Sequence, residues 1–282
     1  MEKRRIAIIG RQRSGTTVFR QLVGSSDNSF DLGEVFHTRV DLATNFWGFL
    51  FSMARDDQSC MHPSNWKFAW DAFIAEQHTA FSADVLVFDL KFEYFPLTFR
   101  HYGREARFFF EDPHTFYIYL RRLNTAAQII SSRLASETHK WLEINHENPR
   151  AALRIGKILI KKIPDSEDIE TIHPDIETIH IDPDILIDEI QAIQQEDESF
   201  IGLISSHLDV VCIEYESLFD ESGNFNMSVI EKISEISGIE PGAFSKVPAL
   251  KRQSTGNCLE KISNRDEIKN RFSGTKFEWM IL

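Results

Sequence analysis

Continuous apolar runs alternate along the chain with segments whose apolar residues recur every three to four positions. The strand-like runs cover residues 6–9, 85–92, 116–120, 176–181 and 210–214. The helical patterns cover residues 16–23, 42–53, 125–142, 183–195 and 228–237. Continuous apolar strands are typical of a sheet covered on both faces, and strands that alternate with helices favour parallel pairing. We therefore expect a three-layer α/β/α fold with a mainly parallel central sheet, formed as one domain over residues 1–282.

The first strand leads into a glycine-rich loop. Gly10, four further residues, Gly15, Thr16 and Thr17 follow the apolar run and open a helical pattern. This spacing resembles the phosphate-binding loop G-x-x-x-x-G-K-S/T of nucleotide triphosphatases, whose backbone N–H groups surround a phosphate. Thr17 stands at the Ser/Thr position, but Thr16 replaces the lysine. The sequence thus predicts a P-loop NTPase-like fold with a phosphate cradle, and it argues against hydrolysis of ATP or GTP.

The composition and charge of the chain exclude several classes of protein. The formal net charge of −12 argues against nonspecific nucleic-acid binding. The apolar runs are too short to span a bilayer, so we expect a cytoplasmic protein with no transmembrane segment. Three cysteines without a C-x-x-C or Cys/His cluster give no indication of a metal site. An acidic protein that binds a polyanion must concentrate positive charge locally, which draws attention to three basic pairs: Arg11 and Arg13, Arg121 and Arg122, Lys251 and Arg252.

A second candidate anion site lies in "YIYLRRLNTAAQIISSR", residues 117–133. The predicted strand ends before Arg121 and Arg122, Asn124 can cap the next helix, and Ser131 lies about two turns further on. This segment and the glycine loop both follow strands, so in a parallel sheet they can share the carboxyl edge where ligands bind. Two interpretations stay open: a guanidinium pair and a hydroxyl that grip a second phosphate, or ordinary surface residues.

Together, these segments resemble sulfotransferases that use 3′-phosphoadenosine 5′-phosphosulfate (PAPS). Residues 13–17, Arg-Ser-Gly-Thr-Thr, match the Arg/Lys-Ser-Gly-Thr-Thr/Ser core of their 5′-phosphosulfate loop. "LRRLNTAAQIISS" is similar to their 3′-phosphate motif, in a form most like the bacterial branch related to trehalose sulfotransferases. "IEYESLF", residues 213–219, and the tail from residue 262 resemble later elements of the family. The resemblance touches both ends and the middle of the chain.

The resemblance implies PAPS as the sulfuryl donor, a hydroxyl acceptor on a carbohydrate or glycolipid, and no catalytic metal. It implies donor binding by Arg11, Gln12, Arg13, Ser14, Gly15, Thr16, Thr17, Arg121, Arg122 and Ser131. Ser131 is nine residues after Arg122, one more than in the cytosolic and heparan-type enzymes, so the main 3′-phosphate ligand is open between Arg121 and Arg122. The family's late G-x-x-G-x-x-K loop has no clear counterpart, and Lys251 with Arg252, or Gly274 with Lys276, are the candidates to replace it.

The catalytic candidates lie in the loop and shortly after it. Arg13 is placed to meet the negative charge that develops on the leaving phosphate. In "DLGEVFHT", Glu34 is the first choice of general base, because "G-E-x-F" resembles a family element that carries the base. His37 is the second choice, since an imidazole can accept a proton in base work. Either residue could instead have a purely structural role.

The sequence also offers one further candidate site residue and two alternative functions. Lys91 follows Asp89 by two residues on one face of a predicted strand, where it could face the site and would compete with a metal for Asp89. The first rival is a P-loop kinase or triphosphatase with a displaced lysine. The second is a non-catalytic ligand-binding protein of the same fold. A homodimer is left open by the sequence.

Overall fold

The structure, a computed structural model, describes residues 3–37, 42–91, 112–138, 178–205, 209–248 and 258–282. The chain divides into two compact units. The first comprises Met1–Arg121 and Leu203–Val247, and the second comprises Arg122–Gly202 and Pro248–Leu282. The expectation of one domain over residues 1–282 stays a prediction.

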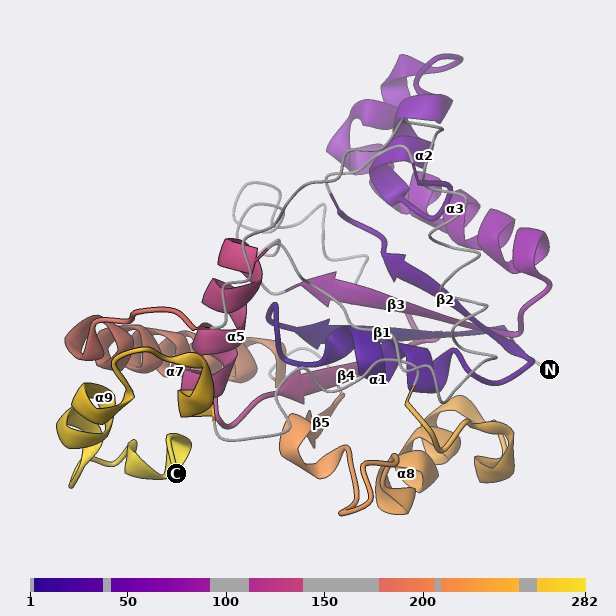
Figure 1. Cartoon of the computed structure of the whole chain (residues 1–282). Helices are drawn as coiled ribbons and strands as arrows, with labels where there is room; N and C mark the ends of the chain where they lie inside the picture. Colours follow the sequence, from indigo (N-terminus) through magenta and orange to yellow (C-terminus); the bar gives the residue numbers. More distant parts are fainter. Residues whose placement is uncertain (1–2, 38–41, 92–111, 139–177, 206–208, 249–257) are drawn as a thin grey trace, which may run out of the picture. The chain divides into compact units, whose positions relative to one another are not determined.

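The first unit is built on a parallel sheet with the strand order β2-β3-β1-β4-β5 (Figure 1). Its strands are β1 (Arg4–Gly10), β2 (Ser29–Glu34), β3 (Val85–Lys91), β4 (Thr115–Arg121) and β5 (Val210–Glu214). All four strand pairings are parallel, which confirms the predicted sheet type. From β1 the chain builds the sheet first toward β2 and β3, and then on the other side toward β4 and β5. Such a reversal places a ligand-binding crevice at the carboxyl ends of the central strands.

Alternate side chains of these strands pack against helices on the two faces of the sheet. On one face, Ile8, Val87 and Ile118 belong to a buried cluster with residues of α1 (Thr16–Val23) and α8 (Met227–Ser237). On the other face, the ring of Phe88 lies 5.5 Å from the ring of Trp70 in α3 (Trp66–Phe81). The first unit therefore has helices on both faces of its sheet, as the α/β/α prediction requires.

The second unit is helical in the part of the chain that the structure describes. It contains α5 (Thr125–Thr138), most of α7 (Pro183–Ser205) and α9 (Arg265–Phe272) around a common apolar core. Asn124 Oδ1 accepts a hydrogen bond from the Ala127 N–H at 2.8 Å, and Asp182 Oδ1 accepts one from the Asp184 N–H at 2.9 Å. The Asn124 cap is as the sequence predicts.

Several element boundaries differ from the prediction. The helix expected from residue 42 is α2 (Phe46–Met53), because Asn45 Oδ1 caps it by accepting from the Gly48 N–H at 3.0 Å. The strand expected over residues 176–181 is, in its described part, one isolated bridge between Ile179 and Ile262. Among the described residues, short 3₁₀-helices are η1 (Gln58–Met61), η2 (Pro63–Asn65), η5 (Tyr215–Ser217), η6 (Pro241–Ala243), η7 (Cys258–Lys261) and η8 (Glu278–Met280). Over the described ranges, no helix is long and apolar enough to cross a bilayer.

A buried histidine near the end of α3 makes the stability of the first unit depend on pH. His78 is 3% exposed, and its Nδ1 donates to the Ala83 carbonyl at 2.7 Å. Burial lowers the pKa of His78 below its ordinary value of 6.5. The unfolded chain therefore binds this proton at a higher pH than the folded chain does. The stabilisation is complete above pH 6.5 and is lost as the pH falls through the lower folded value.

We expect the wild-type free energy of unfolding to drop below pH 6.5 by at most about 1.4 kcal/mol per pH unit on account of His78. Urea unfolding at a series of pH values measures this slope. The His78→Gln variant should have a shallower slope than the wild type, and the exposed His62→Gln variant should keep the wild-type slope. Equal slopes in all three proteins would show that His78 is not the titrating group.

Candidate functional site

The carboxyl end of β1 turns into α1 through a tight loop. Arg13 and Gly15 in this loop have positive φ angles of 63° and 86°. Ser14 Oγ donates to the Arg11 carbonyl at 2.7 Å and closes the turn. Gly15 is the N-cap of α1 and has no side chain that could occupy the first-turn N–H groups. A helix N-terminus of this kind favours an anion, so the local geometry can hold one.

Both glycines of the loop are required by close packing. A Cβ atom at Gly10 would lie 2.6 Å from Thr16 Cγ2, and one at Gly15 would lie 2.3 Å from Tyr215 Cδ2. Neither position can therefore accept a larger residue without movement of its neighbours. Tyr215 is buried and begins η5 directly after β5, so the end of the last strand supports the loop at Gly15.

A bulge in β2 decides which way Glu34 faces. The pairing of β2 with β3 shifts by one residue between Asp31 and Glu34, and Gly33 in between has a φ of 81°. Glu34 consequently pairs with Asp89, whereas the register before the shift would have paired it with Leu90. A shift of one residue turns a side chain to the opposite face of a sheet. Glu34 therefore lies on the same face as Asp89.

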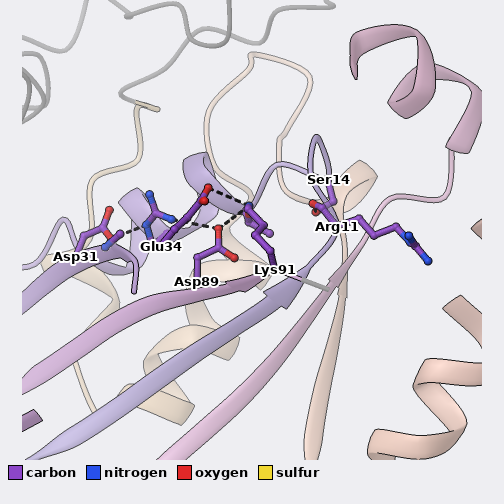
Figure 2. Close-up of polar contacts among 9 residues, drawn as sticks. Arg11, Ser14, Asp31, Glu34, Asp89 and Lys91 are labelled. Carbon is purple, nitrogen blue, oxygen red and sulfur yellow. Dashed lines mark hydrogen bonds and ion pairs between the residues drawn. The ribbon is translucent and has the colours of Figure 1, made fainter. Parts of the chain in front are cut away.

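Lys91, the last residue of β3, connects this face with the loop. Its side chain is buried, and Nζ donates to Thr16 Oγ1 and, at 2.7 Å, to Asp89 Oδ2 (Figure 2). The same nitrogen lies 3.6 Å from Glu34 Oε1. In the sheet, Lys91 is the partner of Gly10 on β1. The ammonium group thus lies beside Thr16, the residue that replaces the lysine of the triphosphatase motif.

Arg20 adds a second cation to the charged cluster formed by Lys91, Asp89 and Glu34. Its guanidinium lies 3.1 Å from Asp89 Oδ2 and 2.5 Å from Asp31 Oδ1. Burial opposes the charge of Arg20, but the surrounding carboxylates outweigh this effect and hold its pKa above the ordinary value. A continuous line of alternating charges therefore runs from Asp31 through Arg20 and Asp89 to Lys91.

The two candidates for the general base differ in their surroundings. The Glu34 side chain is 28% exposed, so it is accessible to a substrate while it faces Lys91. His37 follows in a turn, where its N–H donates to the Glu34 carbonyl at 3.1 Å and its own carbonyl accepts from Asn45 Nδ2 at 2.7 Å. Glu34 is therefore the candidate that contacts the ammonium group beside the loop.

The remaining predicted residues of the loop have different exposures. Gln12 is exposed, and Arg11, Arg13 and Thr17 are half-buried. Figure 2 shows the Arg11 guanidinium pointing away from Lys91. Ser14 and Thr16 are fully buried, so their hydroxyl groups belong to the interior of the loop.

The predicted 3′-phosphate residues are distributed over both units. Arg121 ends β4, the strand that pairs with β1, and it therefore shares the carboxyl edge with the glycine loop as expected. Arg122 is buried in the second unit, and Ser131 is half-buried on α5.

Burial raises the pKa of the Cys258 thiol, and the charge of Arg122 only partly offsets this effect.

Of the two residue pairs that could replace the late loop, the structure describes one. Lys251 and Arg252 lie outside the described residues. Gly274 has a φ of 71°, and Lys276 Nζ lies 4.9 Å from the centre of the Phe277 ring. The predicted replacement of the late loop stays a prediction.

Two residues of the cluster were not found from the sequence: Arg20 and Asp31. Tyr215 lies in the segment "IEYESLF", but its packing against Gly15 was not predicted. A signal for Arg20 exists, because it follows Thr16 by four residues and so lies on the same side of α1. Asp89 and Lys91 also stand out as two charges inside an otherwise apolar strand, where burial is costly without partners. Asp31 carries no such signal, since its strand was not recognised.

No family model and no curated protein matches the chain. The residues that the structure describes include no group of three or more His, Cys, Asp or Glu side chains arranged to hold a metal ion.

Proposed function

We propose that the protein is a PAPS-dependent sulfotransferase of P-loop-like fold that acts on a hydroxyl group of a carbohydrate or glycolipid. One observation carries the proposal: the buried Lys91 contacts both Thr16 of the glycine loop and the carboxylate of Glu34. An anion cradle, a cation and a candidate general base are thereby parts of one cluster. Sulfuryl transfer needs these three elements, because negative charge develops on the leaving phosphate while the acceptor loses a proton.

The donor supplies an activated sulfuryl group. In the proposed step, the acceptor oxygen forms a bond to sulfur while the bond from sulfur to the 5′-phosphate oxygen breaks. The electron pair of the broken bond stays on the phosphate, giving adenosine 3′,5′-bisphosphate, and the acceptor proton passes to a Glu34 carboxylate oxygen. By analogy with phosphoryl transfer, the chain contributes mainly positioning and charge stabilisation.

The loop and two cations are proposed to stabilise the leaving group. The backbone N–H groups at the start of α1, the Arg13 guanidinium and the Lys91 ammonium can each meet developing negative charge. Loss of a single donor of this kind typically lowers the rate by about 10²–10³. Assignment of the 3′-phosphate to Arg121, Arg122 and Ser131, and of further donor contacts to Lys251 and Arg252, rests on the sequence resemblance.

The surroundings of Asp89 favour a reaction that depends on side-chain cations. Asp89 is the acidic residue at the end of the strand next to the loop, but its Oδ2 already accepts from Arg20 and Lys91. A carboxylate that two buried cations neutralise is a weak ligand for Mg²⁺. Lys91 would supply positive charge beside the loop in place of a metal.

Replacing Glu34 with glutamine should separate catalysis from binding. Because the amide cannot accept the acceptor proton, we expect kcat to fall by about 10²–10⁴, while the affinity for adenosine 3′,5′-bisphosphate changes little. The His37→Gln variant should keep most of the activity. If kcat fell in His37→Gln and not in Glu34→Gln, His37 would be the general base.

The direct assay of the proposal is transfer of radiolabelled sulfur from PAPS to a panel of sugars and glycolipids. We expect labelled product without added metal ions and in the presence of a chelator. Absence of transfer to every acceptor, together with failure to bind the bisphosphate product, would reject the proposal.

A second candidate function is that of a kinase or triphosphatase with a displaced lysine. The contact between Lys91 and Thr16 favours it, because an ammonium group lies beside the residue at the motif's lysine position. This candidate requires ATP or GTP to bind with Mg²⁺, and binding measurements with and without the metal distinguish it from the first.

A further inference from the structure

Two charged residues lie in the interior at the end of β3. Asp89 is 1% exposed and Lys91 is 4% exposed, and both occur in a strand whose other residues are apolar. A buried charge is costly unless it is paired and hydrogen-bonded. Residues two apart in a strand lie on one face, so the two side chains are neighbours by construction.

One oxygen atom of Asp89 holds two cations. Oδ2 accepts from Lys91 Nζ at 2.7 Å and from Arg20 NH1 at 3.1 Å. Arg20 is in turn fixed by Asp31. The position of the Lys91 ammonium group therefore depends on a carboxylate that Arg20 also holds.

A lysine side chain needs such a support to act at a defined place. Its flexible four-carbon stem carries a compact charge, and the loss of rotamer entropy opposes its fixation. Without the charge on Asp89, the nearest carboxylate to Lys91 among the described residues is Glu34, at 3.6 Å. Lys91 would then shift from Thr16 toward Glu34 and strengthen the ion pair that it already forms with the candidate general base.

We propose that Asp89 is a positioning residue that holds the Lys91 ammonium group against Thr16 at the glycine loop. Asp89 acts through Lys91 and does not touch the ligand of the loop. The effect on an anion in the loop rests on the proposed function, whereas the position of Lys91 does not.

The chain offers a matched control for the test. Asp31 and Asp89 both pair with Arg20, but in the described structure only Asp89 also pairs with Lys91. The variants Asp89→Asn and Asp31→Asn each remove one carboxylate partner of Arg20, and Asp89→Asn should lower the melting temperature more because it also removes a partner of Lys91. An asparagine offers one neutral acceptor oxygen, which cannot balance two cations.

The first measurement uses the protein without ligand. The rate of Lys91 acetylation by acetic anhydride is followed by mass spectrometry, with the exposed Lys67 as the reference for reagent strength. We expect Lys91 to react about tenfold faster in Asp89→Asn than in the wild type, and at the wild-type rate in Asp31→Asn. Equal rates in the two variants would overturn the inference.

The buried thiol of Cys60 reports whether a variant unfolds. If Asp89→Asn makes Cys60 reactive, Asp89→Glu decides the question, because it keeps the charge for Arg20 but moves the carboxylate outward by one methylene. Faster acetylation of Lys91 with Cys60 still protected would then support the inference. Unchanged acetylation of Lys91 in that variant would overturn it.

The second measurement is the affinity for adenosine 3′,5′-bisphosphate. We expect Asp89→Asn to bind this compound about tenfold more weakly than Asp31→Asn does. Faster acetylation of Lys91 with unchanged bisphosphate affinity would support the positioning role and would count against the proposed ligand of the loop. The two proposals can therefore fail separately.

Discussion

The Gly15→Ala variant is expected to lose binding of adenosine 3′,5′-bisphosphate by at least about 100-fold, the largest effect of any single methyl group in the site. The added Cβ would lie 2.3 Å from Tyr215 Cδ2, and the φ of 86° disfavours any side chain. Either the ring or the loop must move, and movement of the loop turns its N–H groups away from an anion. Calorimetric titration measures the loss.

Gly223→Ala is the matched control for this substitution. Gly223 also has a positive φ, 79°, but a Cβ there meets no atom within 4 Å. It should cost about 1 kcal/mol of stability and leave binding unchanged. Adding Tyr215→Ala to Gly15→Ala should restore part of the affinity by relieving the overlap. Wild-type affinity in the Gly15→Ala variant itself would show that the loop is not the binding site.

The Arg20→Leu variant is expected to lose about 3–5 kcal/mol of unfolding free energy. The substitution removes the counter-charge that the buried carboxylate of Asp89 shares with the half-buried carboxylate of Asp31. The free energy of unfolding of natural domains is about 5–15 kcal/mol in total, so this loss would remove a large part of it. Urea unfolding at neutral pH measures the change.

Lys67→Ala provides the comparison for Arg20→Leu. Lys67 and Asp71 form an ion pair whose side chains are 65% and 51% exposed, and such pairs contribute about 0.3–0.5 kcal/mol. If Arg20→Leu cost no more than Lys67→Ala, the buried line of charges would not be a main support of the first unit.

The main elements of the fold could be predicted because their patterns are local. The apolar runs of β1, β3, β4 and β5 and the cap of α5 lie within short stretches of sequence. β2 was missed because the segment Ser29–Glu34 contains only two apolar residues and a bulge at Gly33 that breaks the alternation. The bulge depends on pairing with β3, which a local pattern does not encode.

In the site, too, local features could be predicted from the sequence and contacts between distant residues could not. The glycine loop follows from the spacing of Gly10 and Gly15, which fixes its backbone. The contact of Lys91 with Thr16 joins residues 75 positions apart, so it depends on the parallel register of β1 and β3. Tyr215 reaches Gly15 from the far strand of the sheet, a packing relation that the sequence alone does not reveal.

Calorimetry with adenosine 3′,5′-bisphosphate tests the central claim most directly. The account predicts binding at one site per chain without a metal ion, weakened in Arg13→Ala and Lys91→Met, and no stronger binding of ATP when Mg²⁺ is added. Tight binding of ATP only with Mg²⁺, and none of the bisphosphate, would contradict the sulfotransferase proposal and favour the displaced-lysine kinase or triphosphatase.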